Sequence, residues 1–123
     1  MSIQLFFGPT WSGKTHLIKA TLERFQNQGK QTKYLYMKEL IENLWDKKQL
    51  DYSEYDAIAF DNIEDLKDHH KTQLSVIDLL DKLLGEKKTV LLASTGKEED
   101  IPEAIYQYIC QNFVKEEAIK CIS

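Results

Sequence analysis

The chain has 123 residues, 42% of them hydrophobic, and a formal net charge of −4 at pH 7. These values are typical of one globular domain over residues 1–123, and the acidic balance argues against direct DNA binding, because phosphate backbones recruit basic surfaces. No apolar run approaches the ~20 residues of a membrane-spanning helix, and the N-terminus lacks a basic-then-apolar signal pattern, so we expect a cytoplasmic protein without membrane contact.

The first predicted element is a short apolar strand, residues 3–7, which runs directly into a glycine-containing loop. Residues 8–15 match the phosphate-binding pattern G-x-x-x-x-G-K-[ST] at every fixed position. In this pattern the glycines let backbone N–H groups turn toward a phosphate, Lys14 supplies positive charge and the Thr15 hydroxyl can bind Mg²⁺. Residues 16–25 have helical apolar spacing, and the N-terminus of such a helix favours a bound anion. The predicted ATP- or ADP-binding residues are Gly8, Pro9, Thr10, Trp11, Ser12, Gly13, Lys14 and Thr15.

Strands and helices are expected to alternate along the rest of the chain. After a stop signal at residues 27–30, the predicted strands cover residues 32–37, 57–60, 90–93 and 118–122. The predicted helices cover residues 38–48, the apolar stripe from Leu74 to Leu84, and residues 102–113, with a polar connector at residues 115–117. Unbroken apolar strands separated by helices indicate a parallel sheet covered on both faces, with its ligand at the carboxyl ends of the strands.

Two adjacent polar residues follow the apolar run 57–60 and extend the predicted site. Asp61 is placed to hold Mg²⁺ together with Thr15, although capping of the next turn is an alternative role. Asn62 stands where hydrolytic P-loop proteins usually carry a second carboxylate that activates water. Because an amide can orient water but cannot take its proton, we expect Asn62 to give only weak water positioning.

Several segments together resemble the nucleotide-binding core of the bacterial replication initiator DnaA and its regulator Hda. In chain order they are residues 8–17, 55–64, 72–73, 90–95 and 101–113, which cover almost the whole chain. The resemblance implies the AAA+ form of the P-loop fold, a three-layer α/β/α sandwich whose five-stranded parallel sheet has the strand order 5-1-4-3-2. It also implies that Thr95 takes the place of the polar sensor residue near the γ-phosphate.

Departures from that family shape the functional expectation. Only Met1 and Ser2 precede the first strand, whereas the family carries a segment there that helps to hold adenine. The chain ends at Ser123, before the position of the family's helical lid and DNA-binding domain. Arg24 is the only arginine, so residues 105–113 carry none of the arginines that reach a neighbour's site in the family. We therefore expect an ATP- or ADP-binding regulatory or adaptor protein of DNA replication initiation, with weak or no hydrolysis. It would be monomeric or weakly oligomeric and would contact a DnaA-like replication protein.

The sequence leaves two other interpretations open. The protein is a small working ATPase or phosphotransferase, or it is a relic whose loop no longer holds nucleotide. Gln4-Leu5-Phe6-Phe7 resembles the sliding-clamp-binding peptides of Hda-like proteins, but a buried central strand cannot be presented to a partner. Trp11 is expected to be exposed at the loop tip, against a base or a partner or simply over the loop. Cys110 and Cys121 are expected to be buried free thiols.

Overall fold

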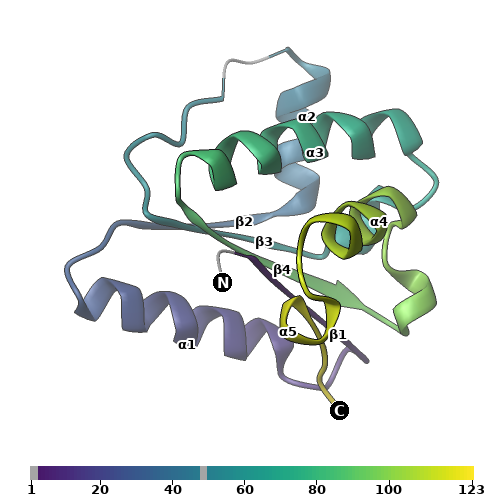
Figure 1. Ribbon diagram of the computed structural model, residues 1–123, viewed down its shortest axis with the longest axis horizontal. Helices are drawn as coiled ribbons and strands as arrows, with labels where there is room; N and C mark the ends of the chain where they lie inside the picture. Colours follow the sequence, from purple (N-terminus) through teal and green to yellow (C-terminus); the bar gives the residue numbers. More distant parts are fainter. Residues whose placement is uncertain (1–2, 48–49) are drawn as a thin grey trace.

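A computed structural model describes residues 3–47 and 50–123, in which the apolar segments of the sequence pair into one five-stranded sheet (Figure 1). All four strand pairings are parallel, and the strand order is β2-β3-β4-β1-β5. This is the predicted order 5-1-4-3-2 read from the opposite edge, so the predicted AAA+ sheet is confirmed. The elements are β1 (Ile3–Gly8), α1 (Lys14–Asn27), β2 (Thr32–Tyr36), α2 (Met37–Trp45), β3 (Ala57–Asp61), η1 (Ile63–Leu66), α3 (His70–Gly85), β4 (Thr89–Thr95), η2 (Glu98–Asp100), α4 (Glu103–Asn112), α5 (Lys115–Ala118) and β5 (Ile119–Cys121).

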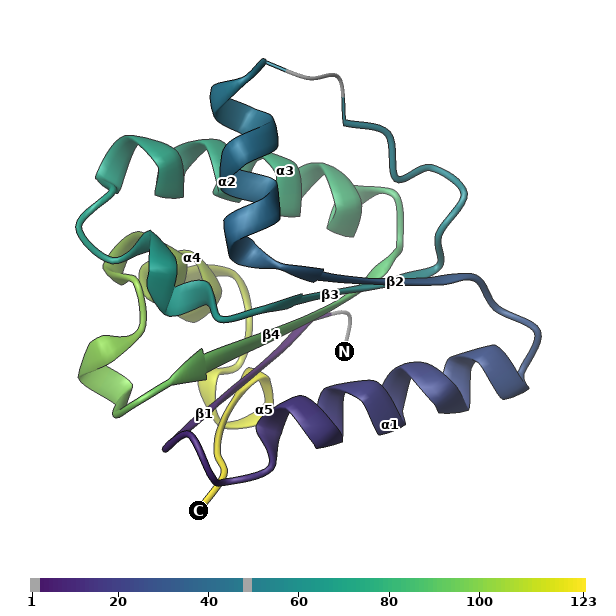
Figure 2. The same ribbon diagram turned by 180° about the vertical axis from the view of Figure 1, so that it is seen from behind.

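Helices cover both faces of the sheet, with α1 on one side and α2, α3 and α4 on the other (Figures 1 and 2). Side chains alternate along each strand, and on β3 the large Ile58 and Phe60 enter the core under α2, α3 and α4. Ala57 and Ala59 face α1, together with Ile18 from that helix. Small residues on this side let α1 lie close to the sheet. None of the described helices is long and apolar enough to span a membrane; their apolar stripes pack on the sheet instead.

Some predicted boundaries move because tertiary packing decides them. Met37, predicted as the end of a strand, begins α2 and is fully buried in the core. Residues 115–117, predicted as a connector, form the helical turn α5, in which the Glu117 and Ala118 N–H groups donate to the carbonyl of Val114. Pro102 precedes α4 rather than standing inside it. The predicted helix end at Lys48, like Met1 and Ser2, lies outside the described residues.

The expectation that both cysteines are buried is wrong. Cys121 is exposed and Cys110 is only half-buried, and both are free thiols. Cys121 ends β5, which pairs with β1 over only three residues at the edge of the sheet. An edge strand of this length has one packed residue, Ile119, and leaves the rest of its side chains to solvent.

Gly8 is required by close packing rather than by an unusual backbone conformation. A Cβ at this position would overlap the carbonyl oxygen of Ile122 and lie 2.9 Å from Ser12 Oγ. The same junction is held by two backbone hydrogen bonds, from Ile122 N–H to the Phe7 carbonyl at 2.7 Å and from Gly96 N–H to the Gly8 carbonyl at 2.8 Å. The start of the phosphate loop is therefore locked between the C-terminal segment and the end of β4.

We predict that Gly8→Ala lowers the free energy of unfolding by about 1–3 kcal/mol, the usual cost of inserting an extra methyl group into a packed site. The matched control is Gly85→Ala at the end of α3, where nothing lies within 4 Å of the added Cβ. Because alanine gives the unfolded chain less conformational entropy than glycine does, Gly85→Ala should leave the free energy of unfolding unchanged or raise it by up to about 1 kcal/mol. Urea unfolding without nucleotide measures both effects, and a wild-type midpoint for Gly8→Ala would contradict the packing argument.

Candidate functional site

The loop of residues 8–15 joins β1 to α1 and turns on a single left-handed residue. Gly13 has φ 84° and immediately precedes Lys14, the first residue of α1. The Ser12 N–H closes a turn onto the Pro9 carbonyl at 3.0 Å. The loop thus leads into the N-terminus of a 14-residue helix, whose free N–H groups and dipole favour an anion.

Two polar groups of the loop fit a ligand that offers oxygen acceptors. Lys14 is only 4% exposed, and its ammonium donates to the Pro9 carbonyl at 3.0 Å, so it folds over its own loop. The hydroxyl of Ser12 is buried and has no hydrogen-bond partner among the described residues. A buried ammonium and an unpaired hydroxyl are costly in an apolar setting and are satisfied by phosphate oxygens. The loop is therefore chemically suited to a phosphate.

The carboxylate of Asp61 joins the phosphate loop to the end of β3. Asp61 is 1% exposed, and its Oδ2 accepts a hydrogen bond from Thr15 Oγ1 at 2.7 Å. Its Oδ1 accepts from the backbone N–H of Asn62 at 2.8 Å. Thr15 and Asp61, the two predicted metal ligands, are therefore in direct contact. Hydroxyl and carboxylate oxygens are the ligands that Mg²⁺ prefers, so the pair fits that ion.

Tyr34 also contacts Asp61, which local patterns in the sequence do not predict. Its hydroxyl, which reaches across from β2, donates to the same Oδ2 atom of Asp61. Burial, this hydrogen bond and the negative charge of Asp61 raise the pKa of Tyr34 well above its usual value, so the hydroxyl is protonated at neutral pH. The strand register pairs Tyr34 with Ala59, a small residue two positions before Asp61. Only that register could have revealed the contact.

Asn62 and Thr95, the two predicted catalytic residues, lie at the carboxyl ends of neighbouring strands. Asn62 follows β3 with φ 58°, a left-handed conformation that asparagine tolerates better than most residues. Thr95 ends β4 and pairs with Gly8 in the sheet, which brings it beside the start of the loop. Its N–H donates to Glu64 Oε1 at 2.9 Å. A carboxylate at position 64 therefore ties η1 to the end of β4, a second contact not anticipated from the sequence.

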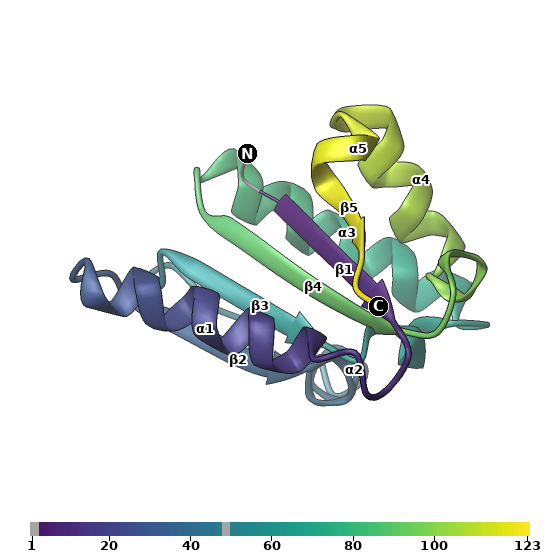
Figure 3. The same cartoon turned by 90° about the horizontal axis from the view of Figure 1, so that it is seen from below.

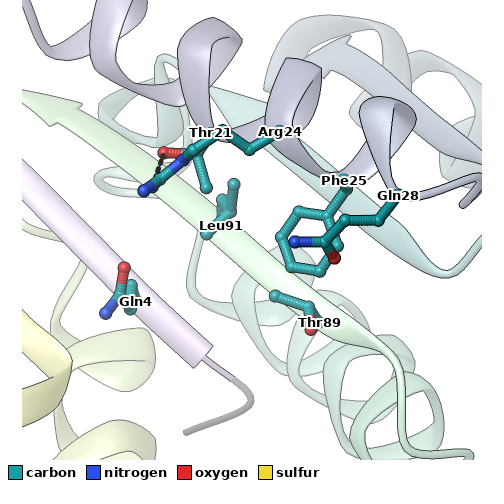
Figure 4. A pocket seen from close by; sticks show the side chains of 7 residues that line it. All are labelled: Gln4, Thr21, Arg24, Phe25, Gln28, Thr89 and Leu91. Carbon is teal, nitrogen blue, oxygen red and sulfur yellow. Dashed lines mark hydrogen bonds between the residues drawn. The ribbon is translucent and has the colours of Figure 1, made fainter.

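Other residues of interest lie away from this cluster. Trp11 is 94% exposed at the loop, so its side chain takes no part in the loop interior. Figure 4 shows Arg24 beside a cavity of about 260 Å³, which is lined by Gln4, Thr21, Arg24, Phe25, Gln28, Thr89 and Leu91. Thr89 begins β4 and Gln28 follows α1, so this cavity lies at the end of the sheet opposite the loop. The only arginine of the chain is therefore remote from the predicted site.

The clamp-peptide interpretation of residues 4–7 conflicts with the sheet. Figure 3 shows β1 between β4 and β5, and both pairings include Leu5, Phe6 and Phe7. Phe6 is also buried beneath α1. This segment positions the phosphate loop and is not available as an extended peptide.

Comparisons with known proteins agree with this fold. The family model described as the bacterial DnaA ATPase domain matches residues 3–114. No curated protein sequence matches the chain significantly. Domain III of the Thermotoga maritima replication initiation protein DnaA superposes with a TM-score of 0.74 at 13% identity, covering 98% of this chain and 54% of that chain.

Two further solved structures give the same picture. AMPPCP-bound DnaA from Aquifex aeolicus has a TM-score of 0.75 at 17% identity, covering 98% of this chain and 40% of that chain. A structure described as a DNA replication initiation factor has a TM-score of 0.76 at 19% identity, covering 100% of this chain and 40% of that chain. The chain thus spans about half or less of these proteins, and similarity at such identities shows the fold alone. Because the family match extends over most of the sequence, the chain belongs to the bacterial DnaA ATPase-domain family.

Proposed function

We propose that this chain binds ATP or ADP with Mg²⁺ at residues 8–15, as a regulatory or adaptor protein of DNA replication initiation related to DnaA and Hda. The observation that carries the proposal is the hydrogen bond between Thr15 and Asp61, which joins the phosphate loop to an acidic strand end. The AMPPCP-bound DnaA from Aquifex aeolicus supports it, because that relative of similar fold holds a nucleotide analogue.

Each residue has a defined part in this proposal. The loop N–H groups and Lys14 hold the phosphates, and the unpaired Ser12 hydroxyl donates a hydrogen bond to a phosphate oxygen. Thr15 and Asp61 hold Mg²⁺, which neutralises phosphate charge when bound. Thr95, beside Gly8, acts as the sensor-like residue at the outer phosphate.

The same residues favour a binding role over rapid hydrolysis. Asn62 cannot accept a proton from water, and the single arginine, Arg24, lies about 15 Å along α1 from Lys14 at the usual helical rise. Arginine fingers contribute about 10³–10⁵ in rate where they act, and residues 105–113 carry none to complete a neighbour's site. We therefore propose a monomer or weak oligomer that acts by contact with a replication protein. DNA contact is not part of the proposal, because the net charge of −4 disfavours it.

Lys14→Ala should weaken ATP and ADP binding by about 100-fold or more, because it removes charge-assisted hydrogen bonds to the phosphates. The fold should persist, since Lys14 has only its own loop as a partner. Lys30→Ala is the control, an exposed lysine beyond the opposite end of α1 that should bind as wild type does. Titration calorimetry measures the affinities and circular dichroism checks the fold. Equal affinities in Lys14→Ala and wild type would show that the loop is not the site.

Asp61→Ala should weaken nucleotide binding in Mg²⁺ much more than in EDTA, because the proposed role of Asp61 runs through the metal. Asp65→Ala is the matched control, since it removes an exposed carboxylate from the neighbouring η1. Calorimetry in the two buffers gives the ratio of affinities for each variant. A ratio in Asp61→Ala as large as that of wild type would exclude Asp61 as a metal ligand.

Hydrolysis should be slow, with turnover below ~1 s⁻¹, the lower end of the usual enzyme range. Asn62→Asp restores a proton acceptor in a residue that tolerates the left-handed backbone at this position, and it should raise the rate only modestly. Asn62→Glu should do less, because a longer side chain is strained there. Steady-state phosphate release measures all three proteins, with Lys14→Ala as the blank. Wild-type turnover near ~1 s⁻¹ or faster, without any partner, would favour a working ATPase instead.

A further inference from the structure

We propose that Tyr34 is a positioning residue for the metal-binding carboxylate of Asp61, so that β2 contributes to Mg²⁺-dependent nucleotide binding. The inference rests on the proposed function, because it assigns Tyr34 a part in the same site. Tyr34 lies outside the phosphate loop and outside the strand end that carries Asp61, and it acts through Asp61 alone.

Asp61 is held by hydrogen bonds at both of its carboxylate oxygens. Three donors from three parts of the chain meet at its two oxygens: the Thr15 hydroxyl and the Tyr34 hydroxyl at Oδ2, and the Asn62 N–H at Oδ1. In the described part of the chain no lysine or arginine forms an ion pair with Asp61. A carboxylate that is 1% exposed therefore has its charge balanced and its orientation fixed by hydrogen bonds only.

The two side-chain donors at Asp61 Oδ2 are not equivalent. Thr15 belongs to the phosphate loop and has its own proposed duty as a metal ligand, so its hydroxyl is shared between Asp61 and the ion. Tyr34 is carried by β2, which is hydrogen-bonded to β3 along its whole length. Its hydroxyl has no ligand duty and remains available to Asp61 when the loop changes partners.

The Tyr34 ring is itself held by contacts on two sides. It packs edge-on against Tyr36, with the ring centroids 5.5 Å apart. The Lys19 ammonium lies 4.9 Å from the Tyr34 ring centroid, a cation–π contact that links the ring to α1. A donor on a fixed ring restricts the rotation of Asp61 before any ligand arrives. Such preorganised outer partners typically contribute about 10–100-fold to metal affinity.

The test compares Tyr34→Phe with wild type in ATP titrations with Mg²⁺ and with EDTA. Tyr34→Phe keeps the ring and removes only the donor. We expect about tenfold weaker binding with Mg²⁺, within the range found for outer partners of metal ligands, and unchanged binding in EDTA. Tyr108→Phe is the matched control, because it removes a hydroxyl that also donates to a carboxylate, Asp81 Oδ1 at 3.0 Å, but between α4 and α3 on the face of the sheet opposite α1. Tyr108→Phe should match wild type in both buffers.

A double-variant cycle makes the test specific. With Asp61→Ala in place, adding Tyr34→Phe should cause no further loss of Mg²⁺-dependent affinity, since the partner of Tyr34 is already gone. The double variant also keeps the question answerable if the lone Tyr34→Phe folds poorly, because it removes donor and acceptor together. Further loss in the double variant, wild-type affinity in Tyr34→Phe, or equal losses with and without Mg²⁺ would each overturn the role of Tyr34. Absence of nucleotide binding by wild type would instead overturn the proposed function itself.

Discussion

The hydrogen-bonded carboxylate of Asp61 is the constraint on which the rest of the site depends. A carboxylate withdrawn from solvent is stable only where donors surround it, and here the donors come from the phosphate loop, from β2 and from the residue that follows β3. Each donor must lie within hydrogen-bond distance of the Asp61 carboxylate for that buried charge to be stable. The position of α1 above the sheet, the pairing of β2 with β3 and the turn after β3 are therefore linked through one side chain.

The composition of the sheet allows this linkage. On its α1 face, β3 carries Ala57 and Ala59 before Asp61, so the strand leaves room for the Tyr34 ring beside it and for α1 above it. On the other face, Ile58 and Phe60 fill the larger core. One five-residue strand thus combines a dry, tightly packed side with a side that ends in a polar cluster. The alternation of side chains along a strand makes the two roles compatible.

Local patterns in the sequence were sufficient for the phosphate loop, for the alternation of strands and helices and for the position of Asp61 after its strand. They are encoded within a few neighbouring residues, and glycine, lysine and threonine at fixed spacing have few other uses. The contacts of Tyr34 and Glu64 were not foreseen, because each depends on the register between two strands or on a turn packed against a strand end. The exposure of Cys121 and the turn of α5 were missed for the same reason: the packing of a short edge strand decides them.

The distribution of charge explains why we propose binding before catalysis. Phosphate binding needs N–H groups, one ammonium and a metal held by oxygens, and the residues for each are gathered within the loop and at Asp61. Hydrolysis needs in addition a group that accepts a proton from water and a cation that neutralises the charge developing on the outer phosphate. Asn62 lacks the first capacity, while Glu64, the nearby carboxylate, already accepts a hydrogen bond from the Thr95 backbone. Arg24 lines a cavity at the far end of the sheet and cannot supply the second. This division of groups is the physical basis on which we propose nucleotide binding in a regulatory role rather than rapid hydrolysis.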